Sequence, residues 1–255
     1  MSGLENLAGR ARGGMLYGIG VGPGDARLIT LRAAGLIQTV DVVGYFAKRG
    51  QAGNARTIAA PLLGVRARAA EELRLEYPVT EEIPTSDAAY RGQIAAFYDR
   101  AAGAIRELLG EGKSVGVLGE GDPFFYGSFI HLWRRLEIDI AIEVVPGVTG
   151  MSGCWTRANV PITSGNEVLT VLPGTLEEQQ LARRLAATDA AVVLKVGRNL
   201  HKVRRAAEAA GVLARALYVE RATMAQERIL PLAEVGDRRG AYFAMVLIPG
   251  SGRRP

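Results

Sequence analysis

Cysteine is almost absent from this chain of 255 residues. The one cysteine, Cys154, excludes an internal disulfide framework and a metal cluster built on cysteine ligands, so nothing calls for an oxidising compartment. Histidine is nearly as scarce. His131 and His201 both lie in helical patterns, where a surface or core role is more common than metal binding. We therefore expect a cytoplasmic protein that requires no metal.

Long hydrophobic runs are missing as well. No apolar stretch approaches the roughly 20 residues that span a bilayer, and the N-terminal residues lack the hydrophobic region of a signal peptide. Residues 1–14 are small, polar and glycine-rich, which predicts a flexible N-terminal tail before structure begins at Met15. With 48% hydrophobic residues the chain can bury a sizeable core, so we expect a soluble protein with no membrane partner.

Lysine is rare among the 31 basic residues, of which only Lys48, Lys113, Lys195 and Lys202 are lysines. The planar fork of arginine meets a carboxylate or phosphate with two hydrogen bonds, which suits an acidic ligand. A GC-rich genome produces the same bias without any ligand, and that origin is the more common one. The Lys/Arg clusters and stacking aromatics of a nucleic-acid-binding face are missing, so we expect no nucleic-acid partner.

Short apolar runs bounded by Gly, Pro and Asp alternate with helical patterns, which indicates an α/β protein with crossover helices. The first half predicts a mostly parallel sheet, with Asp25 capping the first helix. The expected strands are 16–21, 40–45, 114–118 and 141–145, and the expected helices are 27–38, 86–109 and 127–135.

A segment rich in turn formers, ANVPITSG at 158–165, marks the domain boundary. We expect an N-terminal domain over 15–158 and a C-terminal domain over 166–250. The second half predicts strands at 168–172, 190–196 and 215–220 and helices at 177–187 and 200–210. Two further apolar runs, 228–232 and 242–249, have no helix between them, which predicts an antiparallel pair that completes a mixed sheet.

Three glycine-rich loops follow predicted strands of the first half: GIGVGPGD at 18–25, GEGDPFFYG at 119–127 and VPGVTGMSG at 145–153. Because the carboxyl ends of parallel strands meet at one edge of a sheet, the loops should share that edge. Missing side chains would let a ligand lie close to the backbone. Carboxylates of the second loop could accept hydrogen bonds from hydroxyl or amino groups, and its aromatic pair could cover a flat ring.

A nucleotide-dependent dehydrogenase is the alternative enzyme class for the first loop. Such an enzyme needs a dinucleotide-binding turn, and the first loop does not match that pattern. The third glycine of the pattern is replaced by Pro23, and Asp25 brings a carboxylate to the place where a pyrophosphate needs amide donors. A non-catalytic nucleotide-binding protein remains a third possibility, which the residues alone leave open.

Five segments together resemble the tetrapyrrole methylases, a family that depends on S-adenosylmethionine. They are LYGIGVGPGD (16–25), GEGDPFFYGSF (119–129), EVVPGVTGMSGC (143–154), NEVLTVLPGTL (166–176) with VVLKVGRNL (192–200), and ERATMAQERI (220–229). The first three mark the whole family. The LPGTL and KVGRNL segments resemble the subgroup that methylates carbon 20 of precorrin-2, giving precorrin-3A in cobalamin (corrin) biosynthesis.

The resemblance implies two α/β domains, a cofactor cleft between them and a homodimer. Carried over residue by residue, the cofactor contacts fall on Pro23, Glu120, Gly121, Asp122, Phe125, Thr149, Gly150, Val196 and Ala222. Relatives often have Ser or Ala where this chain has Gly150, which leaves a side-chain role there without support. The resemblance also leaves open a family member that acts on cobalt-factor II or on another corrinoid carbon. A non-catalytic tetrapyrrole-binding protein is left open as well.

Methyl transfer from a sulfonium to an electron-rich carbon mainly requires alignment and exclusion of water, so neither a metal nor a covalent nucleophile is needed. After transfer the bridging carbon must lose a proton, and the candidates for a catalytic base are Asp122, Tyr126 and Glu220. Substrate carboxylates should meet cations, for which we favour Lys195, Arg198 and Arg221.

Overall fold

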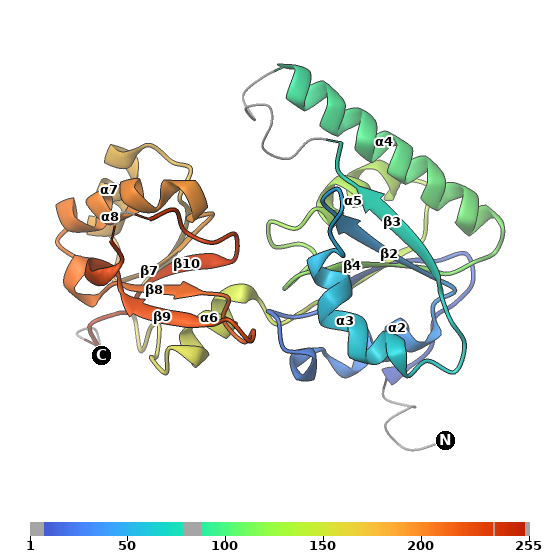
Figure 1. The fold of residues 1–255 in the computed structure, drawn as a ribbon, viewed down its shortest axis with the longest axis horizontal. Coiled ribbons are helices and arrows are strands. Elements are labelled where there is room, and N and C mark those ends of the chain that lie inside the picture. The colour runs from blue at the N-terminus through green and yellow to red at the C-terminus, as the bar shows by residue number, and fades with distance from the viewer. Residues whose placement is uncertain (1–7, 79–87, 237, 253–255) are drawn as a thin grey trace. The chain divides into compact units, whose positions relative to one another are not determined.

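The computed structural model describes residues 8–78, 88–236 and 238–252. The chain divides into two compact units, Met1–Thr149 and Gly150–Pro255, each with its own five-stranded sheet (Figure 1). The domain boundary expected at 158–166 stays a prediction, while in the structure helix α6 (Gly150–Arg157) belongs to the second unit.

Part of the expected N-terminal tail lies against the first unit. Residues 1–7 are outside the described residues, but the Ala11 amide donates to the Thr39 hydroxyl at 3.0 Å and the Arg12 amide to the Tyr17 hydroxyl at 2.8 Å. The backbone of 8–14 is therefore held by hydrogen bonds to that unit.

The first sheet is parallel throughout, in the order β3-β2-β4-β1-β5. Its strands are β1 (Leu16–Gly20), β2 (Val42–Ala47), β3 (Glu71–Glu76), β4 (Val115–Gly119) and β5 (Ile142–Val145). β1, β2 and β4 are buried along almost their whole length, as expected of central strands covered on both faces.

Helices cover both faces of this sheet (Figure 1). Side chains of α4 (Ala88–Gly110) and α5 (Phe129–Leu136) form one core with alternate strand residues such as Val115 and Val117. The intervening Gly116 faces the other side, toward Val40, where α2 (Leu31–Thr39) and α3 (Asn54–Gly64) pack on the strands.

At the amino ends of the first sheet, Ser114 is a fully buried polar residue. Its amide and hydroxyl donate to Asp41 Oδ2 at 2.9 and 2.7 Å, and these bonds lower the pKa of the Asp41 carboxyl. The pair ties the start of β2 to the start of β4 at the end of the sheet away from the glycine-rich loops.

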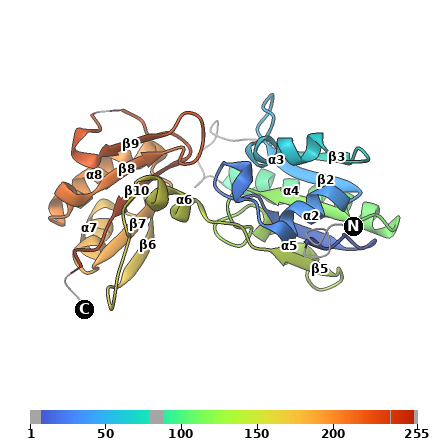
Figure 2. The same cartoon turned by 90° about the horizontal axis from the view of Figure 1, so that it is seen from below.

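The second sheet is mixed, in the order β6-β7-β10-β8-β9 (Figure 2). Its strands are β6 (Leu169–Pro173), β7 (Ala190–Leu194), β8 (Leu217–Glu220), β9 (Arg228–Pro231) and β10 (Ala244–Ile248). β6 is parallel to β7, whereas β10 is antiparallel to both β7 and β8. The prediction that the last two runs pair with each other is wrong, because β8 lies between them and β9 pairs with β8.

Helices α7 (Glu178–Ala186) and α8 (Leu200–Ala209) pack together and join the main core of the second unit. That core includes Ala244 and Val246 of β10. The residue between them, Met245, faces the opposite side, where it approaches Gly150 of α6. Both faces of β10 are therefore covered.

Two elements of the first unit were not predicted. α3 contains Pro61, which interrupts a helical pattern, and β3 is an edge strand whose sequence EELRLE is mostly charged. The expected helix at 27–38 is split: Asp25 caps only the short 3-10 helix η1 (Ala26–Leu28), and Thr30 caps α2 by accepting from the Ala33 amide. The remaining short helices are η2 (Gly197–Asn199), η3 (Leu213–Arg215) and η4 (Leu232–Glu234).

Candidate functional site

The three glycine-rich loops do share one edge of the first sheet. β1 lies between β4 and β5, and all three run in the same direction, so Gly20, Gly119 and Val145 end side by side. We call these strand ends together with the loops that follow, 20–25, 119–127 and 145–149, the first rim. The convergence predicted from sequence is confirmed.

Glycines of the first rim pack against one another. Gly22 and Gly121 form an isolated bridge, in which the Gly121 amide donates to the Gly22 carbonyl at 2.8 Å. A Cβ on Gly20 would lie 2.5 Å from the Gly147 nitrogen, and one on Gly147 would overlap the Gly121 carbonyl oxygen. At these positions the missing side chains therefore make room for neighbouring loops, which differs from the ligand approach that the sequence suggested.

Asp122 links two of the first-rim loops. Its Oδ1 accepts from the Phe124 amide at 2.9 Å, and its Oδ2 accepts from the Gly147 amide at 3.2 Å. Both carboxylate oxygens thus hold backbone of the rim. A cofactor contact at Asp122 stays a prediction, and any such contact would add to this structural role.

Glu120 connects the first rim to the start of α3. The surrounding protein raises the pKa of its carboxyl by withdrawing it from water, although the side chain keeps an exposed face. Hydrogen bonds from the Asn54 side chain and the Ala55 amide partly offset that rise. Asn54 was not predicted as a site residue, because α3 itself was missed.

The aromatic residues of the second loop divide into two pairs. Phe124 packs edge-on against Trp133, with ring centroids 5.4 Å apart, and Phe125 packs edge-on against Tyr126 at 5.0 Å. Phe124 and Tyr126 are exposed. The first rim therefore presents aromatic surface beside its carboxylates, while the covering of a flat ring by these aromatics stays a prediction.

In the second unit the candidate residues also gather at one sheet edge. β7 and β8 are both antiparallel to β10 and β6 is parallel to β7, so β6, β7 and β8 end at the same edge. We call the loops that follow, 174–176, 195–199 and 221–227, the second rim. It carries the exposed Lys195 and Arg198, the partly exposed Arg221, and the buried Val196 and Ala222.

Backbone strain is concentrated in the candidate loops. Five described non-glycine residues have a positive φ, and four of them are Tyr126 (55°) on the first rim and Lys195 (55°), Arg221 (51°) and Thr223 (67°) on the second. The left-handed conformation costs an L-residue about 1–2 kcal/mol. Such strain persists only where surrounding contacts hold it, and it is typical of binding and catalytic sites.

Hydrogen bonds hold the second rim in place. The Arg221 amide donates to the Phe243 carbonyl at 2.7 Å, and the Gly240 amide donates to the Gly197 carbonyl at 2.9 Å. Gly174 lies against the end of β7, because its amide donates to the Leu194 carbonyl at 2.6 Å. The segment before β10 and the LPGT loop are thereby fixed beside the candidate residues.

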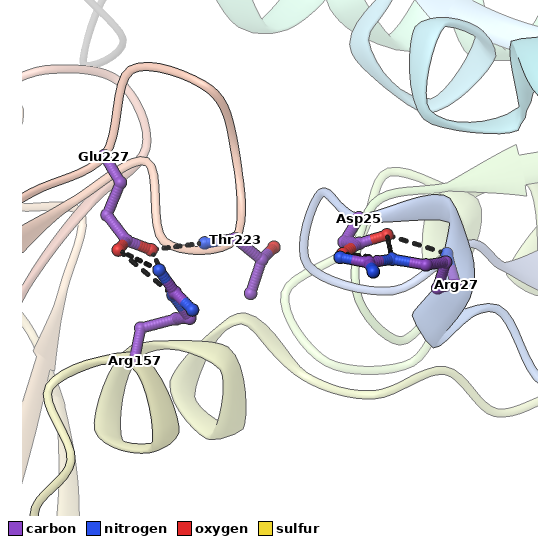
Figure 3. A network of polar contacts seen from close by, with 5 residues as sticks. All are labelled: Asp25, Arg27, Arg157, Thr223 and Glu227. Atoms are coloured by element: carbon purple, nitrogen blue, oxygen red, sulfur yellow. Dashed lines mark hydrogen bonds and ion pairs between the residues drawn. The ribbon is translucent and has the colours of Figure 1, made fainter.

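An ion pair supports the turn after β8 (Figure 3). Arg157 Nε donates to the two Glu227 carboxylate oxygens at 3.0 and 2.8 Å, and the Thr223 amide donates to Glu227 Oε2 at 2.8 Å. These bonds lower the pKa of Glu227, with Arg157 as the largest cause. The sequence showed Glu227 within the ERATMAQERI segment, but its partner Arg157 lies far away in the chain.

Glu220, a candidate base, is engaged by its neighbours. Its Oε2 accepts from the Tyr218 hydroxyl at 2.9 Å and lies 3.2 Å from Arg238 Nη2. Only 16% of the Glu220 side chain is exposed. Asp25 is also engaged, because its carboxylate accepts from the Arg27 amide and guanidinium (Figure 3).

A sequence profile of the Tetrapyrrole (Corrin/Porphyrin) Methylases matches residues 15–236. The chain belongs to the tetrapyrrole methylases. A precorrin-2 C(20)-methyltransferase of Sinorhizobium sp is 50% identical over 242 residues, which cover 95% of this chain and 98% of that protein. A cobalt-precorrin-2 C(20)-methyltransferase of Salmonella typhimurium is 29% identical, over 92% of this chain and 96% of that one.

Solved structures of tetrapyrrole methylases share the fold. A cobalt precorrin-4 methyltransferase, CbiF, aligns with a TM-score of 0.68 at 24% identity, over 92% of this chain and 95% of that one. A uroporphyrin-III C-methyltransferase of Thermus thermophilus, in complex with S-adenosylhomocysteine, aligns with a TM-score of 0.64 at 22% identity, over 92% of each chain. The predictions of the family and of two α/β domains, one parallel and one mixed, are confirmed.

Among the described residues of this tetrapyrrole methylase, no three or more His, Cys, Asp or Glu side chains are grouped so that they could hold a metal ion. Within the same ranges, every helix is too short or too polar to cross a bilayer.

Proposed function

We propose that this methylase transfers a methyl group from S-adenosylmethionine to carbon 20 of precorrin-2, giving precorrin-3A for cobalamin biosynthesis. The observation that carries the proposal is the 50% identity to the Sinorhizobium sp precorrin-2 C(20)-methyltransferase over nearly the full length of both proteins. Because the Salmonella typhimurium relative is named for the cobalt-containing substrate at only 29% identity, the metal-free substrate is favoured.

S-adenosylmethionine supplies an electrophilic methyl group on a sulfonium. The first rim offers groups that suit its polar parts: Glu120 can accept hydrogen bonds from hydroxyl or amino groups, and Phe125 and Tyr126 offer ring faces for a base. On the second rim, the backbone at Val196 and Ala222 is held beside the ends of β7 and β8. The Thermus thermophilus structure with S-adenosylhomocysteine supports the choice of cofactor.

Cations of the second rim suit a substrate with several carboxylates. Lys195 and Arg198 are exposed after the end of β7, and the strained backbone at Arg221 presents a third cation at the end of β8. These residues would bind and orient the macrocycle. Correct positioning of two reactants can supply roughly 7–11 kcal/mol of the barrier reduction, which suits a reaction whose acceptor carbon is already electron-rich.

Removal of the proton from carbon 20 calls for a base. Of the three candidates, Asp122 binds two loop amides and Glu220 binds Tyr218 and Arg238, so both carboxylates have structural partners. Tyr126 is half exposed on the first rim, in a strained conformation. Tyr126 also has a partner, because its ring packs edge-on against Phe125, so partners do not separate the three candidates and we propose all three for this step.

The deciding experiment incubates the purified protein with S-adenosylmethionine and either precorrin-2 or its cobalt-containing counterpart. We expect precorrin-2 to gain the mass of one methyl group, with NMR placing that group on carbon 20. Methylation at another carbon would refute the position, and faster turnover of the cobalt compound would refute the metal-free substrate. Binding of S-adenosylhomocysteine without any turnover would indicate a carrier instead of an enzyme.

The family resemblance also leads us to propose a homodimer that acts in the cytoplasm. Light scattering coupled to size-exclusion chromatography should give twice the mass of the 27.2 kDa chain. A monomer at assay concentration would contradict the dimer while leaving the proposed reaction intact.

A further inference from the structure

We propose that Glu227 and Arg157 are positioning residues, which hold the turn Arg221–Thr223 in the conformation that S-adenosylmethionine binding requires. The inference rests on the proposed function, because the proposed cofactor site includes Ala222, which lies in that turn. Neither Glu227 nor Arg157 is among the residues carried over from the family.

The turn cannot be held by its own conformational preference. Arg221 and Thr223 both have a positive φ, at 51° and 67°, and Ala222 between them is buried. Relaxation of either residue toward negative φ would displace the Ala222 backbone. Contacts from outside the turn must therefore fix it.

Glu227 provides one of these contacts. Its Oε2 accepts from the Thr223 amide at 2.8 Å, while the Arg221 amide is bound separately by the Phe243 carbonyl at 2.7 Å. The turn is thus fixed at both ends. The side chain of Glu227 is only 17% exposed, so its carboxylate is withdrawn from competition with water.

Arg157 in turn fixes Glu227 (Figure 3). Arg157 Nη2 donates to Glu227 Oε1 at 2.8 Å, in addition to the two bonds from Nε, so the guanidinium meets both carboxylate oxygens. Arg157 is the last residue of α6, which begins at the predicted cofactor residue Gly150 and packs against β10. The Arg157–Glu227 ion pair therefore connects α6, which carries the predicted cofactor residue Gly150, to the turn that carries Ala222.

A purely structural ion pair is the alternative, and the chain offers a matched control for it. Arg205 and Glu178 join α8 to α7 in the same unit, with Nη2 to Oε2 at 2.6 Å and further bonds from Nε. They lie outside both rims. Glu178→Gln therefore removes a comparable ion pair without touching the turn.

The test measures S-adenosylhomocysteine affinity by calorimetry, kinetic constants with precorrin-2, and Tm. For Arg157→Ala we expect Kd for S-adenosylhomocysteine and KM for S-adenosylmethionine to rise about tenfold, as on loss of a charge-assisted hydrogen bond, with kcat little changed. Glu227→Gln keeps one oxygen acceptor for the Thr223 amide and should show a smaller rise in both constants. Arg157→Lys should recover much of the affinity. Glu178→Gln should leave both constants at the wild-type value.

Unchanged cofactor affinity in Glu227→Gln and Arg157→Ala, with a Tm shift like that of Glu178→Gln, would overturn the inference. A loss of affinity in Glu178→Gln as large as that in Arg157→Ala would also overturn it, because the effect would then not be specific to this turn. If Glu227→Gln does not fold, the two Arg157 variants decide. A wild-type protein that binds S-adenosylhomocysteine but does not methylate precorrin-2 would refute the proposed function and leave the positioning role standing.

Discussion

The two rims reach an ordered backbone by largely different means, although Tyr126 is a strained non-glycine residue on the first rim. On the first rim, Gly20, Gly121 and Gly147 lack side chains, and their backbones pack directly on one another. On the second rim, Lys195, Arg221 and Thr223 keep their side chains in a conformation that glycine adopts without cost. The comparison fits the proposal that strain is accepted where a side chain takes part in binding and is avoided where only backbone is needed.

This difference fits the division of roles proposed for the two rims. The packed glycines give the first rim a fixed backbone, with Glu120 and the aromatic residues set on it. The second rim presents Lys195, Arg198 and Arg221, which are cations suited to substrate carboxylates. A side chain added to a packed glycine of the first rim should therefore lower stability, whereas glycine in place of a strained residue of the second rim should raise it.

The largest effect is expected for Gly147→Ala. Its Cβ would overlap the Gly121 carbonyl oxygen, and a backbone atom cannot yield as a flexible side chain can. We expect the free energy of unfolding to fall by about 2–3 kcal/mol, as for overpacking of a core, together with most of the activity. Denaturant unfolding measures the change. Gly103→Ala in α4, where nothing lies within 4 Å of the added Cβ, is the control and should be neutral or stabilising.

Asp122→Ala should have the next largest effect. The loss of its bonds to the Phe124 and Gly147 amides should cost about 1–2 kcal/mol and weaken S-adenosylhomocysteine binding by loosening the first rim. Asp122→Asn keeps one oxygen acceptor and should retain part of both. Calorimetric affinity that is unchanged in the alanine variant would show that this loop does not take part in cofactor binding.

Arg221→Gly should reverse the usual sign of a substitution. Relief of the left-handed strain should raise stability by up to about 1 kcal/mol, while KM for precorrin-2 increases because a cation is lost from the second rim. Thermal unfolding and steady-state kinetics measure the two effects. A glycine variant that is less stable than wild type, at unchanged KM, would contradict both parts of the comparison.

The smallest effect is expected at the amino ends of the first sheet, away from both rims. Hydrogen bonds from Ser114 lower the pKa of Asp41 in the folded protein. The ionised carboxylate therefore stabilises the fold at pH values above the unfolded-state pKa of about 3.9, and this stabilisation is lost as the pH falls through the folded-state pKa. Asp41→Asn should therefore be less stable than wild type at pH 7 by about 0.5 kcal/mol, since the group is exposed and screened. That gap should narrow on acidification below about pH 4, without any change in cofactor affinity.

The elements predicted correctly from the sequence are those whose burial produces a clear hydrophobic pattern. β1, β4 and β7 are almost completely buried and were found as apolar runs. β3 was missed because an edge strand with charged residues has no such pattern, and α3 was missed because Pro61 interrupts it. The pairing of β9 with β8 could not be predicted either, because strand order depends on which neighbours complete the sheet.

For the site, the chain order of strands and loops was enough to predict that the first-rim loops meet. The chain order could not show that the Asp122 carboxylate accepts a hydrogen bond from the Gly147 amide, because such bonds depend on loop geometry. Nor could it connect Arg157 with Glu227, since nothing in the local pattern relates residues so far apart in the chain. Contacts between distant segments are the part that required the structure.

The charged edge of the first sheet restricts how copies of this protein can associate. An exposed edge strand normally invites hydrogen bonding by another chain, but β3 lines that edge with Glu71, Glu72, Arg74 and Glu76. Like charges would face each other if two such edges met in register. Continuation of the sheet from one molecule into the next is therefore disfavoured at β3, and the proposed dimer would use another surface.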